Sequence, residues 1–354
     1  MANPWLNRDA LDSHSLDWRQ FADFRESTLA NGSRIIQGYS PSGLDVTLLP
    51  DRGMDIWLAR YKGMPLTWVA PGSPHLPDYG QSWLSLFNGG LLTTCGLTHA
   101  GPPEEDRDVH GNYTRLRATA PHIYFDGAAE RINLVTTVQQ SRLFGEQLHL
   151  SRKISLYLKQ PTIRIRDTVL NLSDEPSPFM LLYHCNLGYP LVQQGTELVV
   201  NSEIYPRDDV ALSSAASWAH YEAASAGYQE QVFFHHVLDD GTGTARAALL
   251  NADFGLQFSW DVKGLPYLSQ WKNTRQGIYV NGIEPGNCIP EGQNAARESG
   301  RLVMLQPGEE QQFDLSMTVI DGVEAVDACR HKIASQSGTL ASGCDLTGYE
   351  RYNG

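Results

Sequence analysis

Short β-prone runs separated by turn residues fill most of the chain after residue 33. In the run IRIRDTVL at 163–170, the first side chains alternate between apolar and polar, which is typical of a strand with one face in water. Strands are predicted at residues 34–39, 45–49, 54–60, 67–70, 114–118, 132–139, 148–158, 162–172, 179–183, 197–200, 230–236, 245–251, 256–260, 265–272, 277–283, 301–305 and 312–319. The best candidate for a helix is 323–333, and short helical turns are expected around 16–26. Many short strands without a fixed repeat predict an all-β fold, a large antiparallel sandwich.

The chain shows no break in composition that would separate two domains. We therefore expect one sandwich domain at residues 31–334, with an N-terminal extension, residues 1–30, packed on it. Residues 335–354 are rich in Ser and Gly and are expected to form a loosely packed tail. A length of 354 residues is compatible with a single large all-β domain.

Charge and composition exclude several classes of partner. A net charge of −13 and an isoelectric point near 5.2 leave no basic stripe for nucleic acid and disfavour an anionic membrane surface. No apolar run reaches the roughly 18 residues of a transmembrane helix, and residues 1–9 lack the pattern of a signal peptide. Five cysteines without a CxxC pair favour free thiols over disulfides. We expect a soluble cytoplasmic protein.

The sequence GIYVNGIEPGN at 277–287 is the first candidate for chemistry. Its β-prone run leads to Glu284, which lies between two glycines and directly before Pro285. Glycine allows a ligand to approach the backbone closely, and proline biases the preceding residue toward an extended conformation. The preceding segment supplies Trp271, on which a sugar ring can stack. An ordinary acidic loop residue is the competing interpretation of Glu284.

Three other short segments contain candidate functional residues. His110 lies at a loop-to-strand junction beside a glycine, and His184 ends an apolar strand. Arg52 and Asp55 flank a tight glycine turn. Histidines at strand ends and Asp/Arg pairs at turns are more often structural. Their joint appearance with the carboxylate described above favours a functional set.

A metal site is a competing interpretation of the histidines. His99, His110, His184 and the pair His235 and His236 could supply imidazoles. Adjacent strand residues point to opposite faces, so His235 and His236 cannot bind one ion without distortion. The HxH and HExxH spacings are absent, as are the GxSxG elbow of serine hydrolases and the glycine-rich loops of nucleotide-binding proteins. We therefore expect neither a metal nor a cofactor.

Several motifs in a fixed order resemble one superfamily. HG at 110–111, YHCNL at 183–187 and GIEP at 282–285 resemble motifs of the aldose 1-epimerase (galactose mutarotase-like) superfamily. The segments DRGMD at 51–55, TCGL at 94–97, GPP at 101–103, LPY at 265–267 and QWK at 270–272 resemble its bacterial aldose-epimerase-like branch. The resemblance covers about residues 34–320. It implies a β-supersandwich, in agreement with the strand pattern.

The resemblance also implies an activity. It implies an isomerase of carbohydrate metabolism that interconverts the α and β anomers of a free sugar by opening and closing the ring. His184 would protonate the ring oxygen as general acid, Glu284 would take the proton of the anomeric hydroxyl as general base, and His110 would hydrogen-bond the substrate. Further substrate contacts would come from Arg52, Asp55, Asn88, Arg115, Asn186 and Trp271.

The sequence leaves the substrate open. Galactose mutarotases carry an Asn-Arg motif before the first histidine, whereas this chain has NGG at 88–90 and CGLTH at 95–99. Another aldose, a deoxy-sugar or a sugar acid fits equally well. The alternative function is a carbohydrate-binding or sugar-sensing protein without turnover, which eight tryptophans and fifteen tyrosines would also suit. The expected partner is a small sugar, and a homodimer is compatible with the sequence.

Overall fold

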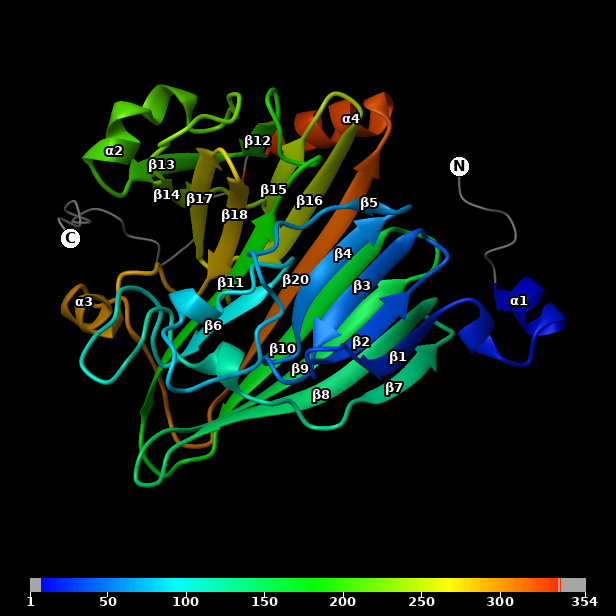
Figure 1. Cartoon of the computed structure of the whole chain (residues 1–354), viewed down its shortest axis with the longest axis horizontal. Coiled ribbons are helices and arrows are strands. Elements are labelled where there is room, and N and C mark those ends of the chain that lie inside the picture. Colours follow the sequence, from blue (N-terminus) through cyan, green and yellow to red (C-terminus); the bar gives the residue numbers. More distant parts are fainter. Residues whose placement is uncertain (1–7, 337, 339–354) are drawn as a thin grey trace.

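A computed structural model describes residues 8–336 and 338 as three antiparallel sheets with few helices (Figure 1). The five-stranded sheet has the order β1-β2-β3-β4-β5, with bounds Asp23–Thr28, Arg34–Tyr39, Leu44–Leu49, Asp55–Tyr61 and Met64–Pro65. The eight-stranded sheet has the order β12-β15-β16-β20-β10-β9-β8-β7, with bounds Glu197–Val200, Thr244–Leu250, Phe254–Asp261, Glu310–Asp321, Thr162–Asn171, Gln147–Tyr157, Arg131–Ser141 and His122–Asp126. The seven-stranded sheet has the order β13-β14-β17-β18-β11-β19, with bounds Ser202–Pro206, Gln231–Val237, Tyr267–Arg275, Ile278–Gly286, Ser177–Leu187 and Val303–Leu305, and β6 (Thr93–Leu97) also pairs with β11. The predicted all-β antiparallel architecture is confirmed.

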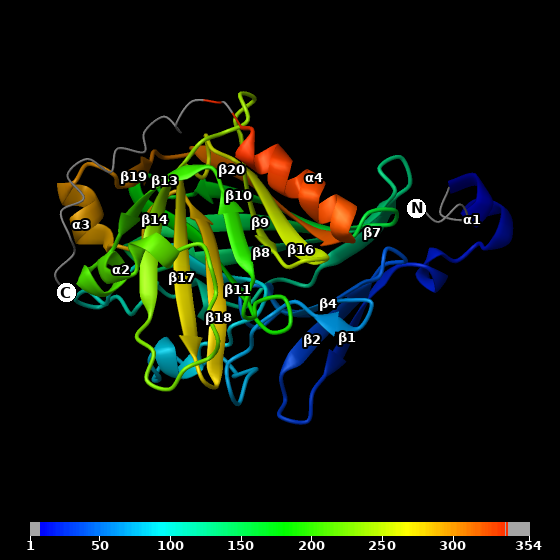
Figure 2. The ribbon, with the colours of Figure 1, turned by 90° about the horizontal axis from the view of Figure 1, so that it is seen from above.

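The helices are short and lie outside the sheets. They are α1 Arg8–His14, α2 Asp209–Ser213, α3 Gln293–Glu298 and α4 Val323–Ala334, with three-residue helical turns at Trp18–Gln20, Leu84–Leu86, Tyr113–Arg115 and Ala215–Ser217. Through Val326, Cys329 and Ile333, α4 packs against β15 of the eight-stranded sheet (Figure 2). This helix is the one predicted at 323–333. Within residues 8–336 and 338, no helix has the length and apolar character needed to cross a membrane.

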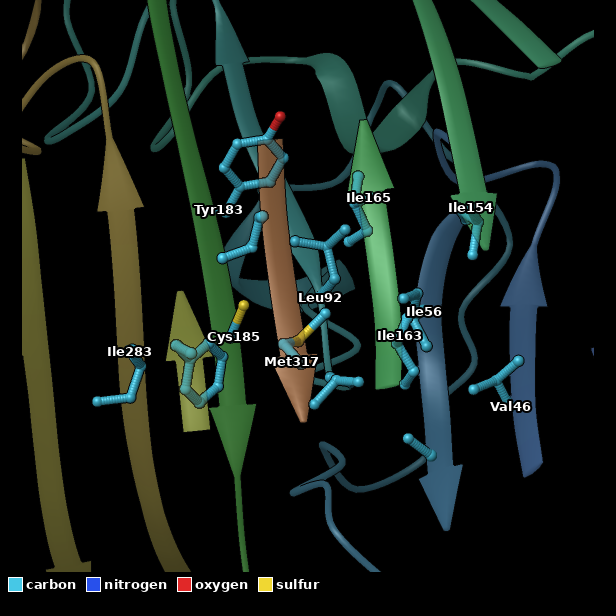
Figure 3. Close-up of a cluster of buried hydrophobic side chains, with 14 of the residues drawn as sticks. Val46, Ile56, Leu92, Ile154, Ile163, Ile165, Tyr183, Cys185, Ile283 and Met317 are labelled. Carbon is cyan, nitrogen blue, oxygen red and sulfur yellow. The ribbon is translucent and has the colours of Figure 1, made fainter. Parts of the chain in front are cut away.

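The main core lies between the sheets and fixes the orientation of β11 and β18. In Figure 3, Tyr183, Cys185 and Ile283 of the seven-stranded sheet gather with Met317 and Ile163 of the eight-stranded sheet. Successive side chains of a strand point to opposite faces. The residues next to these three in sequence therefore point away from the main core.

A buried cluster of charged side chains ties the inner face of β11 to neighbouring strands. Arg152 of β9 donates to Asp167 of β10 at 2.7 Å and to Asp55 of β4 at 3.1 Å. The hydroxyl of Tyr183 donates to Asp167 at 2.8 Å. All four side chains are buried, and we call Arg152, Asp167, Asp55 and Tyr183 the inner charge cluster. Its opposite charges are paired and hydrogen-bonded, as buried charges must be.

Two of the predicted strands are wrong. The segment 114–118 begins in the helical turn Tyr113–Arg115 and makes a single bridge at Ala118. The Tyr113 hydroxyl donates to the Gly53 carbonyl at 3.0 Å, and its ring is fully buried, so tertiary packing outweighs local β propensity. The segment 67–70 likewise forms isolated bridges in place of a strand.

The two ends of the chain were expected to lie outside the sandwich, as an extension and a tail. In the N-terminal extension, where helical turns were expected, β1 pairs with β2 along its whole length as the edge of the five-stranded sheet. The helical turn Trp18–Gln20 lies within the expected range 16–26. Of the predicted tail 335–354, all but residues 335, 336 and 338 lie outside the described residues.

Candidate active site

Two neighbouring strands of the seven-stranded sheet bring a histidine and a glutamate together. The register of β11 against β18 pairs Leu182 with Gly286 and Cys185 with Ile283, which places His184 directly across from Glu284. Because Cys185 and Ile283 point into the main core (Figure 3), His184 and Glu284 point to the other face. Both side chains are buried, and His184 Nε2 lies 3.2 Å from Glu284 Oε1.

A glycine makes room for this carboxylate. Gly282 precedes Glu284 by two residues on β18 and pairs with Trp271 on β17. A Cβ atom at Gly282 would collide with Glu284 Oε1 and lie 3.0 Å from the Cβ of Trp271. The absence of a side chain lets Glu284 and Trp271 share one small area of the sheet. The Trp271 and His184 ring centroids are 5.6 Å apart.

Loops supply the walls above this floor. His110 has a left-handed backbone with φ 56°, and its N–H donates to the Gly101 carbonyl at 3.0 Å. This geometry brings the His110 ring centroid to 5.9 Å from that of His184. Trp83 lies 4.8 Å from the His110 ring and stacks on Phe87, with 4.6 Å between the ring centroids.

These residues line a cavity of about 700 Å³, within the range of small-molecule sites. One side is aromatic and apolar, and the other side carries charged residues that follow β13 and precede β14. The lining residues are Trp83, Leu84, Phe87, Gly101, Pro102, Val109, His110, His184, Arg207, Asp208, Asp209, Val210, Glu230, Val232, Trp271, Glu284 and Pro290. A sugar needs this combination of ring surfaces and convergent polar groups.

Burial drives the central ionisable groups toward their neutral forms. It raises the pKa of Glu284 to about 8. The nearby charge of Glu230 adds to this increase, and the charge of Arg207 opposes it. Burial lowers the pKa of His184 to about 4. Burial and the neighbouring imidazoles lower the pKa of His110 to about 3. Near pH 7 the proton therefore lies on the carboxyl group of Glu284 and not on an imidazole.

Three polar atoms at the centre of the site lack hydrogen-bond partners. Within the described part of the chain, Glu284 Oε1, His184 Nδ1 and His110 Nδ1 are buried and accept or donate no hydrogen bond. Folded proteins rarely leave buried polar atoms unpaired, and each exception calls for an explanation. A polar ligand in the cavity would satisfy them.

Comparison with known proteins identifies the family. A family model described as "Domain of unknown function (DUF4432)" matches residues 30–319. The chain belongs to the DUF4432 family. No curated protein sequence matches it.

Solved structures place the DUF4432 protein in a superfamily. A candidate aldose 1-epimerase from Klebsiella pneumoniae is 26% identical with a TM-score of 0.84, covering 90% of this chain and 88% of its own. A galactose mutarotase-like protein from Clostridium acetobutylicum is 14% identical with a TM-score of 0.65, covering 85% and 99%. The galactose 1-epimerase of Lactobacillus acidophilus is 14% identical with a TM-score of 0.55, covering 85% and 99%. The fold is that of the aldose 1-epimerase (galactose mutarotase-like) superfamily, as the motifs indicated.

The DUF4432 protein brings four of the nine predicted site residues to the cavity. His184, Glu284, His110 and Trp271 line it together. The other five are absent from the lining: Arg52, Asp55, Asn88, Arg115 and Asn186. All five are buried, and each makes hydrogen bonds to other parts of the protein.

Two of these five residues hold the loop that contains Trp83. Arg52 donates to the main-chain carbonyls of His75 at 2.8 Å and Leu86 at 2.9 Å. Asn88 Oδ1 accepts from the His75 N–H at 2.8 Å. Arg52 and Asn88 therefore hold in place the loop that carries Trp83 and Phe87.

The remaining three bond within the protein around the site. Asp55 belongs to the inner charge cluster. Arg115 pairs with Asp108, which also accepts from the Trp83 N–H at 2.7 Å. Asn186 donates to two main-chain carbonyls, one of them that of His184 at 3.0 Å. Arg115 and Asn186 therefore bond to segments that carry the cavity residues Trp83 and His184.

The lining residues that were not predicted from the sequence include Trp83, Phe87, Arg207 and Glu230. Trp83 and Phe87 lie in SWLSLF at 82–87, where two aromatic residues in a polar-flanked turn were the available signal. Arg207 and Glu230 are separated by a long irregular segment and meet only in the fold, with 3.4 Å between Arg207 Nη2 and Glu230 Oε1. No local pattern distinguishes them from ordinary surface charges.

The five histidines of the metal hypothesis do not all meet in one place. His235 is buried and bonds to Ser202 and Gln270, and it lies outside the cavity lining. Among residues 8–336 and 338, no group of three or more His, Cys, Asp or Glu side chains could hold a metal ion.

Proposed function

We propose that this protein is an aldose 1-epimerase-like isomerase that interconverts the anomers of a free sugar. The observation that carries the proposal is the His184–Glu284 pair, 3.2 Å apart at the floor of a cavity of sugar size. The ring oxygen and the anomeric hydroxyl of a sugar are both bonded to C1. Two proton-transfer groups at this separation can therefore reach both oxygens of one bound ring. The names of the structural relatives agree with this reaction.

The pair moves one proton from one oxygen to the other. Glu284 takes the proton of the anomeric hydroxyl, the electron pair of that O–H bond forms the carbonyl, and the bond from C1 to the ring oxygen breaks. His184 gives its proton to the ring oxygen, which becomes a hydroxyl. The aldehyde rotates about the C1–C2 bond, and the reverse transfers close the ring on the other face. Atoms, electrons and charge balance without a further reactant.

The shifted pKa values favour one of the two proton arrangements in this cycle. Before ring opening, the pair is a carboxylate and an imidazolium; after it, the pair is a carboxylic acid and a neutral imidazole. Both states contain the same number of protons. Burial favours the second state, because it raises the pKa of Glu284 to about 8 and lowers that of His184 to about 4. The protein therefore favours the proton arrangement that accompanies the open-chain aldehyde.

The remaining lining residues bind and orient the sugar. Trp271 offers a ring face beside the pair, and the Trp83 and Phe87 rings form the facing wall. His110 is uncharged near pH 7 and hydrogen-bonds a sugar hydroxyl through its free Nδ1 or its Nε2. Arg52, Asp55, Asn88, Arg115 and Asn186 shape these segments without touching the sugar.

Exchange spectroscopy of anomeric protons across a panel of free aldoses and deoxy-sugars tests the proposal. We expect enzyme-dependent exchange on at least one sugar, reduced about 10²–10⁴-fold by Glu284→Gln or His184→Ala. Glu284→Gln should leave sugar affinity nearly unchanged. Glu310→Gln, which alters an exposed residue of β20, is the matched control. Saturable binding without exchange on any sugar would contradict the proposal and support a sugar-binding protein.

A further inference from the structure

One side of the cavity carries a fixed carboxylate beside the sugar-stacking tryptophan. Glu230 Oε2 accepts a hydrogen bond from Trp271 Nε1 at 2.7 Å, and Oε1 accepts from Arg207 Nη2 at 3.4 Å. The Glu230 side chain is 47% exposed, so it lies at the mouth of the cavity and not in its floor. Two donors on separate elements hold this carboxylate against the edge of the Trp271 ring.

The carboxylates around Arg207 carry more negative charge than its guanidinium carries positive charge. Arg207 Nε also donates to Asp208 Oδ2 at 2.9 Å, so two carboxylates share one guanidinium. Asp209 adds a third carboxylate to the lining. Partial burial by itself would raise the pKa of Asp208, but hydrogen bonds from the Ala211 N–H and from Arg207 outweigh it and lower this pKa. Asp208 is therefore ionised near pH 7. Glu230, Asp208 and Asp209 with Arg207 give this wall a net negative charge, and we call them the acidic wall.

No other cation in the lining offsets the acidic wall. Within the described part of the chain, Arg207 is the lone lysine or arginine among the lining residues. The rest of the lining includes the apolar side chains of Trp83, Phe87 and Val109. His110 and His184 are neutral near pH 7, because burial lowers the pKa of each. The faces of aromatic rings attract cations and repel anions.

We propose that the acidic wall selects sugars without an anionic group and favours sugars that carry an ammonium group. A carboxylate or phosphate on the sugar would face like charges across a partly buried site, where screening is weaker than in bulk water. An ammonium group would meet carboxylates and aromatic faces. A preference in catalytic rate rests on the proposed function. The same preference in binding affinity is expected even without catalysis.

The test compares three sugars of the same ring stereochemistry: the neutral aldose that shows exchange, its 2-amino-2-deoxy form and its uronic acid. At a pH at which the amine is protonated, we expect kcat/KM of the amino sugar to equal or exceed that of the neutral sugar. We expect the uronic acid to be at least about 10-fold poorer. Added salt should narrow both differences. A uronic acid that is turned over as well as the neutral sugar, or better, would overturn the inference.

A variant ties the preference to the acidic wall. Glu230→Gln keeps an acceptor for Trp271 Nε1 but removes one charge, so the ratio of neutral to anionic kcat/KM should fall by about 3-fold or more. Glu310→Gln makes the same change in charge on β20, outside the cavity lining. It should leave the ratio of neutral to anionic kcat/KM unchanged. An unchanged ratio in Glu230→Gln would contradict the role of the wall.

Failure of the proposed function gives a different result. Without exchange on any sugar, the same three sugars are titrated against the intrinsic fluorescence of the tryptophans. The amino and neutral sugars should then bind more tightly than the uronic acid. The reverse order of affinity would overturn the charge preference even if no sugar is turned over.

Discussion

Two buried clusters of ionisable side chains lie on opposite faces of β11 and differ in their hydrogen bonding. Tyr183 faces inward, where the Arg152 guanidinium bonds to Asp167 and the Tyr183 hydroxyl bonds to the same carboxylate. His184, the next residue, faces the cavity with Glu284, and there His184 Nδ1 and Glu284 Oε1 have no hydrogen-bond partner within residues 8–336 and 338. The two environments are one residue apart in sequence.

The difference in hydrogen bonding accompanies a difference in charge. Although burial acts against it, the nearby carboxylates raise the pKa of Arg152 well above its ordinary value, so its guanidinium stays charged. Burial without a bonded counter-charge raises the pKa of Glu284 and lowers that of His184, so the pair is neutral near pH 7. Removing one partner of a buried charge is costly because the other charge is left uncompensated, whereas a buried polar atom without a hydrogen-bond partner remains available to a ligand.

The largest effect is expected from breaking the inner charge cluster. Arg152→Met leaves Asp167 and Asp55 buried without their counter-charge and should lower the free energy of unfolding by about 3–5 kcal/mol. Urea denaturation followed by circular dichroism measures it. The control is Arg164→Met, which breaks the pair with Asp314 in a more exposed position and should cost about 1 kcal/mol or less. Equal losses in the two variants would show that burial does not distinguish them.

The opposite sign is expected on the cavity face. Glu284→Gln should raise the free energy of unfolding by about 1–3 kcal/mol at pH 8, because the folded protein no longer buries a carboxyl group that is ionised in the unfolded chain. The pKa of Glu284 rises from 4.5 to about 8 on folding, so its stability contribution is complete below pH 4.5 and is lost as pH rises to about 8. The gap between variant and wild type should therefore widen across that range. A gap that does not depend on pH would contradict the shifted pKa.

The strand pattern predicted the fold and the inner part of the site because both depend on local alternation. His184 and Glu284 lie on strands whose neighbouring residues, Cys185 and Ile283, are core residues, and short motifs marked both positions. Arg207 and Glu230 could not be predicted, because they meet through tertiary folding of a long irregular segment. The acidic wall could therefore not be predicted from the sequence.

The same limit explains the predicted sugar contacts that lie elsewhere. Asp55 and Arg115 have the residue types of a binding site, but they bond to Arg152 and Asp108 inside the protein. A buried polar residue that fixes a loop and one that binds a ligand have similar local sequence. Hydrogen-bond partners distinguish them, and only the structure provides these partners.

A smaller effect on catalysis is expected from crowding the pair. A Cβ at Gly282 would collide with Glu284 Oε1, so Gly282→Ala should displace the carboxylate and lower the exchange rate by about 10-fold or more. The same measurement on Gly80→Ala, where the nearest atom to the new Cβ is Asp78 Oδ1 at 3.3 Å in an exposed loop, should show no change. Full activity in Gly282→Ala would mean that the position of Glu284 is not critical.

The smallest effect is a shift in the pH dependence of exchange. The active pair contains one transferable proton, so kcat/KM should hold a plateau that falls below about pH 4, where His184 gains a proton, and above about pH 8, where Glu284 loses its own. The charge of Glu230 raises the pKa of Glu284, so Glu230→Gln should move the upper limb to lower pH by a fraction of a unit. Arg207→Gln should move it in the opposite direction, because Arg207 lowers that pKa. A single limb near the ordinary pKa of histidine, unmoved by either variant, would place the proton on an exposed imidazole and contradict a pair governed by burial.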